Sequence, residues 1–186
     1  MIIFIGVAGA GKSVQGKLLA DHFGLPWIST GELLRMFIAG DRRKRMLKGD
    51  LLKDEELYEV VDPMLRIVCK YGELVLDGFP RTIAQANWLV DFSEKIGHPI
   101  KCVVHLEATE DIVKQRLLSR GRPDDTEEGI SARFKEYEAN TKPIIYHYEE
   151  LGIPVVHVNG VGKEDEISKE IISKARPYVD ADSSKN

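Results

Sequence analysis

The chain has 186 residues, 43% of them hydrophobic, and a formal net charge of −4 at pH 7. This length fits one substantial domain with small insertions, and the acidic balance disfavours nonspecific binding of nucleic acid. No apolar run reaches membrane-spanning length, and the N-terminal apolar run has no basic region before it, so we expect neither a membrane span nor a signal peptide. Cys69 and Cys102 lie in apolar stretches, which is typical of buried free thiols in a reducing compartment such as the cytoplasm.

The first element is an apolar run over residues 2–5, which predicts a buried parallel strand. It leads into Gly6–Ser13, which reads G-x-x-x-x-G-K-S, and apolar residues at helical spacing follow. A strand, a glycine loop and a helix start form the context of a phosphate-binding loop, where backbone N–H groups and the helix N-terminus surround an anion. Lys12 adds a positive charge for the outer phosphates. We therefore expect the chain to bind a nucleoside triphosphate or a close relative.

Four further strands are predicted, and helical patterns separate them. They cover residues 26–29, 74–76, 102–106 and 155–158. This alternation predicts an α/β fold with a central, five-stranded, mainly parallel sheet flanked by helices. Ligands bind such sheets beyond the carboxyl ends of the strands, so the segments that follow the first three strands should meet at one edge.

Two stretches look like excursions from this core. Residues 30–59 are long and charged for a simple crossover and predict a small helical lobe, although the basic run after Asp41 is also compatible with a solvated helix face. Residues 116–128 combine glycine, proline and charge and predict a loop between two helices. Pro63 and Pro143 predict kinks or breaks in helices, and the polar tail from residue 180 is expected to fray.

Several arginines lie just beyond predicted strands or in the second excursion. Phosphoryl transfer depends mainly on positioning and on stabilisation of charge, and the arginine fork can grip a phosphate with two hydrogen bonds. One arginine alone would be read as a surface residue, but a set that converges from separate segments predicts a kinase with a phosphorylated acceptor. The set is Arg35, Arg81, Arg116, Arg120, Arg122 and Arg133.

Carboxylates accompany these cations. Asp77 ends a predicted strand beside the glycine loop, where a carboxylate holds Mg²⁺ directly or through water. Asp124 and Asp125 either pair with neighbouring arginines and hold their loop closed, or belong to a solvated loop. The five histidines show no ligand spacing, so we expect them to be structural.

Four motifs in this order resemble those of adenylate kinases, from residue 2 to about residue 162. They are Gly6–Ser13; Ser29-Thr30-Gly31 with Leu34-Arg35; Leu76-Asp77-Gly78-Phe79-Pro80-Arg81-Thr82 with Gln85; and Arg120-Gly121-Arg122 with Asp124, Asp125 and Arg133. The resemblance implies a P-loop NTPase fold and the Mg²⁺-dependent reaction ATP + AMP ⇌ 2 ADP, which maintains the adenine nucleotide balance. It also implies a core of residues 1–29, 60–115 and 129–186, an AMP-binding lobe of residues 30–59 and a short lid of residues 116–128.

The resemblance further implies a role for individual residues. The residues that it implies for ATP binding are Gly9, Ala10, Gly11, Lys12, Ser13, Val14, Arg120 and Gly162. The residues that it implies for AMP binding are Thr30, Arg35, Asp50, Leu51, Leu52, Gly78, Phe79, Pro80, Arg81, Gln85, Arg122 and Arg133. The catalytic residues are Lys12, Arg81, Arg120, Arg122 and Arg133, and Ser13 and Asp77 hold Mg²⁺ directly or through water. The lid has no cysteine and is too short for the zinc hairpin of some bacterial members, so we expect no zinc, and we expect a monomer without nucleic-acid or membrane partners.

The chain departs from the family in one place, and two alternatives stay open. The family usually reads G-K-G-T where this chain has Gly11-Lys12-Ser13-Val14, so we expect the Ser13 hydroxyl to replace that of the threonine. UMP/CMP kinases of the same fold typically carry alanine and asparagine where this chain has Thr30 and Gln85, and a glutamine amide can meet the N1 and N6 edge of adenine. The other alternative is a nonenzymatic nucleotide switch, which would need no second phosphate site.

Overall fold

The computed structural model describes residues 1–41, 53–123 and 125–179. Three predicted AMP-binding residues, Asp50, Leu51 and Leu52, lie outside these ranges, as do the basic run after Asp41, Asp124 and the tail from residue 180.

The centre of the fold is a five-stranded sheet with the order β2-β3-β1-β4-β5. Its strands are β1 (Ile2–Ile5), β2 (Trp27–Ser29), β3 (Val75–Asp77), β4 (Cys102–Glu107) and β5 (Val155–Asn159). Every neighbouring pair is parallel. The structure thus confirms the predicted α/β class, and each predicted strand is found with its ends shifted by at most one residue.

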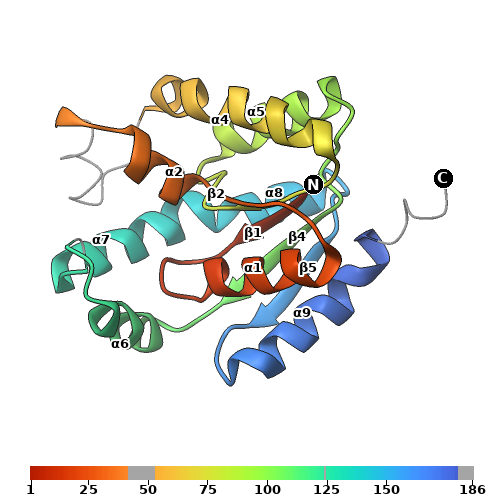
Figure 1. Cartoon of the computed structure of the whole chain (residues 1–186). Helices are drawn as coiled ribbons and strands as arrows, with labels where there is room; N and C mark the ends of the chain where they lie inside the picture. Colours follow the sequence, from red (N-terminus) through yellow and green to blue (C-terminus); the bar gives the residue numbers. More distant parts are fainter. Residues whose placement is uncertain (42–52, 124, 180–186) are drawn as a thin grey trace.

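Helices connect the strands, and Figure 1 labels them in chain order. They are α1 (Lys12–Phe23), α2 (Thr30–Phe37), α4 (Asp54–Val68), α5 (Ile83–Lys95), α6 (Glu110–Arg120), α7 (Glu127–Glu136), α8 (Pro143–Glu150) and α9 (Glu164–Val179). A single π-turn, Tyr137–Thr141, joins α7 to α8. Pro143 occupies the first turn of α8, where its missing N–H costs nothing, whereas Pro63 lies inside α4 without ending it.

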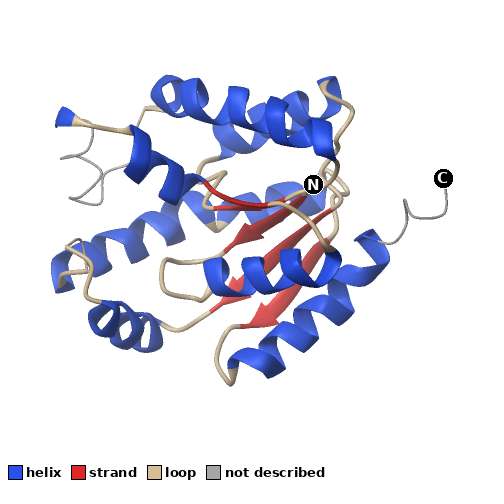
Figure 2. Cartoon of the chain, in the orientation of Figure 1, coloured by secondary structure: helices blue, strands red, loops and turns tan. Residues whose placement is uncertain are grey.

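The sheet lies between two helical layers (Figures 1 and 2). Side chains alternate along β1, so Ile2 and Phe4 pack into one core with residues of α1 and α9. Ile3 and Ile5 point to the opposite face and pack against α4, α5 and α8. Because both faces of β1 are covered, this strand is apolar on both sides, as expected for a central parallel strand.

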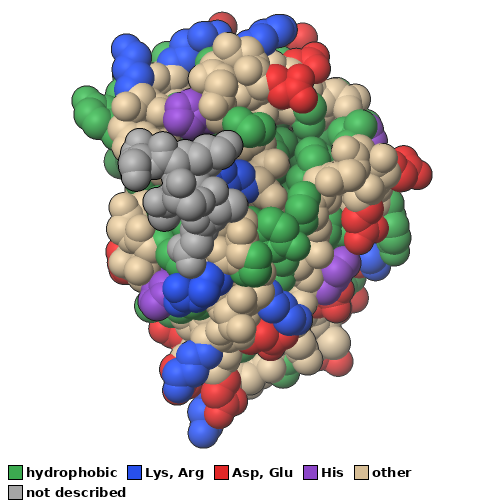
Figure 3. Space-filling view, turned by 90° about the vertical axis from the view of Figure 1, so that its right-hand side faces the viewer, with side chains coloured by type: hydrophobic (Ala, Val, Ile, Leu, Met, Phe, Trp, Pro, Cys, Tyr) green, Lys and Arg blue, Asp and Glu red, His purple; other side chains and the backbone are tan. Residues whose placement is uncertain are grey.

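The carboxyl ends of β1, β2 and β3 lead into the glycine loop, α2 and the Gly78–Thr82 turn, respectively. The face seen in Figure 3 carries acidic and basic side chains that are interspersed. Among the helices of the described residues, none combines the length and apolarity needed to cross a bilayer.

Candidate functional site

A cavity of about 570 Å³ opens at these strand ends. It is lined by the glycine loop, the first turns of α2, the turn after β3, the ends of α6 and α7, and the segment after β5. The predicted site residues that line it are Gly9, Ala10, Gly11, Lys12, Ser13, Val14, Arg35, Asp77, Gly78, Pro80, Arg81, Gln85, Arg120, Arg122, Arg133 and Gly162. Residues from distant parts of the sequence, from Gly9 to Gly162, therefore meet around one space.

The glycine loop has a backbone conformation that side chains would oppose. Gly9 and Gly11 have φ angles of +88° and +108°, in the left-handed region, and a Cβ on Gly9 would lie 2.9 Å from Cγ of Leu117. Gly11 is the residue that precedes α1, so the helix begins at Lys12. The loop thereby places the N-terminus of α1, with its partial positive charge, in the wall of the cavity.

Lys12 folds back over this loop. Its ammonium Nζ donates hydrogen bonds to the carbonyl oxygens of Gly6 at 2.7 Å and Val7 at 2.9 Å. Burial lowers the pKa of Lys12 to about 8, against the opposing attraction of Asp77. The ammonium is therefore desolvated before any ligand arrives, and a phosphate would offer it an anionic partner.

Ser13 and Asp77 meet beside Lys12. The Ser13 hydroxyl donates to Oδ2 of Asp77 at 2.6 Å, and the Asp77 side chain is buried. Hydroxyl and carboxylate oxygens are the donor set that Mg²⁺ prefers. The two residues predicted to hold Mg²⁺ are thus adjacent, and their oxygens fit this ion.

The turn after β3 is fixed by buried hydrogen bonds. The Thr30 hydroxyl donates to the carbonyl oxygen of Asp77 at 3.1 Å, and a Cβ on Gly78 would lie 2.8 Å from that hydroxyl oxygen. Nε of Arg81 donates to the carbonyl oxygen of Gly78 at 3.0 Å, which orients the guanidinium at the cavity wall.

Thr30 and Phe79, which were also predicted to be site residues, are not among the residues that line the cavity. Each is only 1% exposed. The Phe79 ring packs edge-on against Trp88 in the core.

Gln85 lies at the base of the cavity and is almost fully buried. Its side-chain oxygen accepts a hydrogen bond from the backbone N–H of Arg81 at 2.8 Å, and its side-chain nitrogen donates to Oδ1 of Asp54 at 2.7 Å. Thr82 caps α5 by accepting from the Gln85 N–H at 3.2 Å. A glutamine amide has two donors and two acceptor lone pairs, so one of each remains for a nucleobase edge.

A carboxylate in the α6–α7 loop binds one arginine from each of the two helices. Asp125 accepts hydrogen bonds from Nε of Arg120 at 2.8 Å, from a terminal nitrogen of Arg120 at 2.7 Å and from Arg133 at 3.0 Å. Burial acts to raise the pKa of Asp125, but the hydrogen bonds from Arg120 and Arg133 outweigh it and lower the pKa to about 2. Of the two alternatives for Asp125, the structure shows the pairing with neighbouring arginines and not a solvated carboxylate, and the backbone N–H of Arg122 also donates to it at 3.1 Å.

Arg116 belongs to the predicted arginine set but was given no individual role, and Glu136 was not singled out in the sequence; both line the cavity. Arg116 donates to the carbonyl oxygens of Ala10 at 3.1 Å and Gly160 at 2.9 Å, so it joins the glycine loop to the segment after β5. Glu136 lines the cavity, and burial raises the pKa of its carboxyl group although Arg81 opposes this shift. Helical spacing could have identified Glu136, because it lies three residues after Arg133.

The structure brings two of the five histidines together beside a carboxylate, a grouping that their spacing along the sequence does not indicate. His105 on β4 and His157 on β5 are paired in the strand register and lie beside Glu107. The two histidines are 52 residues apart in sequence, and their pairing depends on the alignment of β4 with β5, which spacing along the chain does not reveal.

Comparison with known proteins agrees with the resemblance seen in the motifs. A family model described as adenylate kinase matches residues 4–153. The adenylate kinase of Bifidobacterium longum is 39% identical over 183 residues, which cover 92% of this chain and 97% of that protein. Adenylate kinase 1 of a Nostoc species is 36% identical over 176 residues, which cover 91% of this chain and 95% of that protein. A Xanthomonas campestris adenylate kinase is 37% identical over 180 residues, with 91% and 96% coverage.

Proposed function

The chain belongs to the adenylate kinase family, and we propose that the cavity described above binds both of its substrates. As a member of this family it is a phosphotransferase that interconverts ATP and AMP with two ADP, and thereby maintains the adenine nucleotide balance. One observation carries the assignment of the site. A phosphate-binding loop and arginines from three other segments line the same cavity, as transfer between two phosphorylated molecules requires.

We assign the triphosphate to the glycine loop and the monophosphate to the opposite wall. Lys12 and the N-terminus of α1 would hold the outer phosphates of ATP, while Arg35 and Arg81 would hold the phosphate of AMP. Arg120, Arg122 and Arg133 come from the α6–α7 region, and they would stabilise the charge on the group in transfer.

The protein contributes position and charge to the reaction. Arg120 and Arg133 already lie together on Asp125, so their guanidinium groups are oriented before substrates bind. Substrate phosphates compete with Asp125 for these groups. Closure of the cavity around the substrates would exclude water, which otherwise competes as the acceptor of the phosphoryl group.

The family generally uses Mg²⁺ with ATP, and we propose that Ser13 and Asp77 hold this ion directly or through water. Their hydrogen bond of 2.6 Å supports the idea that Ser13 supplies the hydroxyl that the family usually takes from the next position. When bound, Mg²⁺ neutralises charge on the outer phosphates. We propose no zinc in the lid, since residues 116–128 contain neither cysteine nor histidine.

AMP is the proposed acceptor, rather than UMP or CMP. The support is Gln85, whose buried amide keeps one donor and one acceptor for the adenine edge, and Thr30 at the turn beside it. The test is ADP formation from ATP with AMP, UMP or CMP at equal concentrations. We expect AMP to react at least ~100-fold faster. Faster turnover of UMP would overturn the assignment to AMP, and an absence of turnover with all three would favour a nucleotide switch.

We further propose that the enzyme acts as a cytoplasmic monomer whose partners are ATP, AMP and ADP. A single cavity contains all the proposed phosphate-binding groups, so one chain suffices for the reaction. Cys69 and Cys102 are buried free thiols, which suits a reducing compartment.

A further inference from the structure

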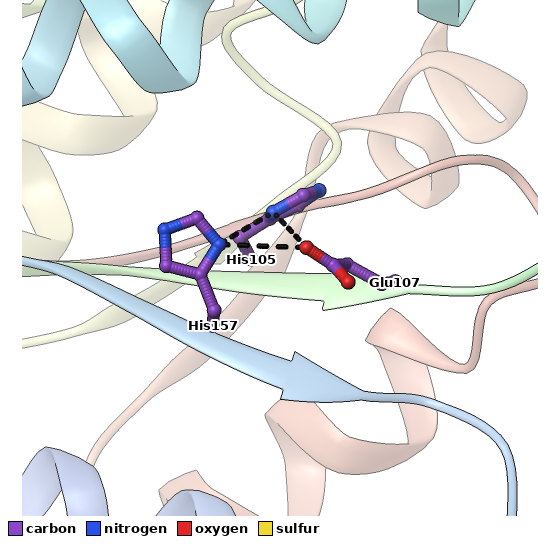
Figure 4. Close-up of side chains that lie close together, drawn as sticks. All are labelled: His105, Glu107 and His157. Atoms are coloured by element: carbon purple, nitrogen blue, oxygen red, sulfur yellow. Dashed lines mark hydrogen bonds and ion pairs between the residues drawn. The ribbon is translucent and has the colours of Figure 1, made fainter.

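Three side chains converge between β4 and β5 (Figure 4). His105 and Glu107 are two residues apart on β4 and therefore share one face of the sheet. His157 on β5 lies opposite His105 in the strand register. The nucleotide cavity is lined by other residues, so this group is a separate feature of the described structure.

The three ligand atoms form a nearly regular triangle. The two Nδ1 atoms are 3.2 Å apart, and Oε1 of Glu107 lies 3.3 Å from Nδ1 of His105 and 3.5 Å from Nδ1 of His157. A tetrahedral zinc ion with bonds of about 2.0–2.1 Å places its ligand atoms about 3.3 Å apart. The triangle therefore has the size of one face of a zinc coordination tetrahedron.

The other ring nitrogen of each imidazole, Nε2, also has a hydrogen-bond partner. Nε2 of His157 lies 3.2 Å from Oε1 of Glu149 on α8, and Nε2 of His105 lies 2.8 Å from the Tyr137 hydroxyl oxygen. A carboxylate can only accept, so in the neutral tautomer that this contact favours, Nε2 of His157 carries the proton and Nδ1 presents a lone pair. Outer partners of this kind are typical of metal-binding histidines, because they fix the tautomer and the orientation of the ring.

The two Nδ1 atoms lie within hydrogen-bond distance of each other, so either a proton or a metal ion can lie between them. Glu107 and His157 are about half exposed, which gives an ion a path from solvent.

We propose that Nδ1 of His105, Nδ1 of His157 and the carboxylate of Glu107 bind one divalent transition-metal ion, preferably Zn²⁺, with water as the fourth ligand. Two imidazoles and one carboxylate are a ligand set that suits zinc. The ion would link the edge strand β5 to β4 and stabilise the fold without taking part in phosphoryl transfer. This proposal departs from the expectation of no zinc, which rested on the lid sequence alone.

The competing interpretation is a cluster held together by hydrogen bonds alone. The test uses the full-length chain, purified without a histidine tag, stripped with a chelator and kept free of nucleotide. ZnCl₂ is titrated calorimetrically, and Co²⁺ is titrated with its visible absorption as a report of tetrahedral geometry. The variants are His157→Ala and Glu107→Gln, both at half-exposed positions, and Glu149→Gln. His98→Ala, which changes a histidine outside this group, is the matched control.

We expect one equivalent of Zn²⁺ to bind the wild-type chain and the His98→Ala control, and to raise the melting temperature of both. His157→Ala and Glu107→Gln should bind at least ~100-fold more weakly, and Glu149→Gln ~10–100-fold more weakly, with circular dichroism unchanged. If the wild-type chain takes up no zinc, or if His157→Ala and Glu107→Gln bind it as well as His98→Ala does, the proposal is wrong and the cluster is a hydrogen-bonded one.

Discussion

Lys12 is buried, and its ammonium group donates hydrogen bonds to carbonyl oxygens of its own loop. Replacement by methionine, Lys12→Met, keeps most of the stem and removes the charge that faces the outer phosphates. We expect kcat to fall at least ~100-fold, the scale of removing one preorganised electrostatic group. Steady-state kinetics with ATP and AMP measure this loss, and circular dichroism checks the fold. Near-normal turnover by a folded variant would contradict the role of Lys12.

Substitution of Ser13 tests whether a hydroxyl that is displaced by one position in the sequence still helps to bind Mg²⁺. Ser13→Ala removes the group that lies 2.6 Å from Asp77, so half-maximal activity should require more Mg²⁺, about 10-fold. Adding Val14→Thr should recover part of this loss. Val14 is 45% exposed, so the new hydroxyl is not left buried without a partner, and the two side chains are nearly equal in volume.

The measurement is the Mg²⁺ dependence of initial rates for the three proteins. The variant Val14→Thr alone is the control for any effect on packing. If Ser13→Ala leaves the Mg²⁺ dependence and kcat unchanged, Ser13 is merely a small residue at a position that the family fills with glycine.

At the scale of elements, Asp125 joins the end of α6 to α7 by accepting from Arg120 and Arg133. Asp125→Asn keeps the shape and removes the charge, which leaves two guanidinium groups close together. We expect the free energy of unfolding to fall by about 2 kcal/mol, as for the loss of buried charge-assisted hydrogen bonds. Urea denaturation measures this, and bound nucleotides should narrow the difference because their phosphates replace the missing carboxylate.

The same group gives a pH dependence with a definite sign. The pKa of Asp125 is about 2 in the folded chain, below its ordinary 3.8, so its contribution is fully present above pH 3.8. That contribution is lost as the pH falls toward 2. Asp125→Asn should therefore lose less stability than the wild-type chain over this interval. Parallel stability curves for the two proteins below pH 4 would contradict the assignment.

The elements differ in how far the sequence determines them. The apolar runs of β1 and β4 and the glycines of the loop carry strong local signals, because burial on both faces and left-handed backbone limit the residues allowed there. Local patterns do not contain the alignment of β4 with β5, so the meeting of His105 and His157 could not be predicted. The link made by Arg116 to Ala10 and Gly160 likewise depends on packing between distant segments.

For the whole molecule, the central expectation is that both nucleotides occupy one continuous cavity. A ligand that joins two adenosines through a chain of phosphates should then raise the melting temperature more than an ATP analogue and AMP together at the same concentrations. The second half of such a ligand binds at a high effective concentration, because the first half already holds it in the cavity. Differential scanning fluorimetry with each ligand measures the effect.

Arg81→Ala separates the two halves of that cavity. Arg81 lies on the wall assigned to AMP, so its loss should remove about 2–3 kcal/mol of binding for AMP and for the joined ligand, while the shift with the ATP analogue stays nearly unchanged. Arg66→Ala is the matched control, because Arg66 is an exposed arginine that pairs with Asp62 on α4. If the joined ligand stabilises the wild-type chain no more than the ATP analogue does, the two substrates do not share one cavity. If Arg81→Ala instead abolishes the effect of the ATP analogue and spares that of AMP, the two sites are assigned in the wrong order.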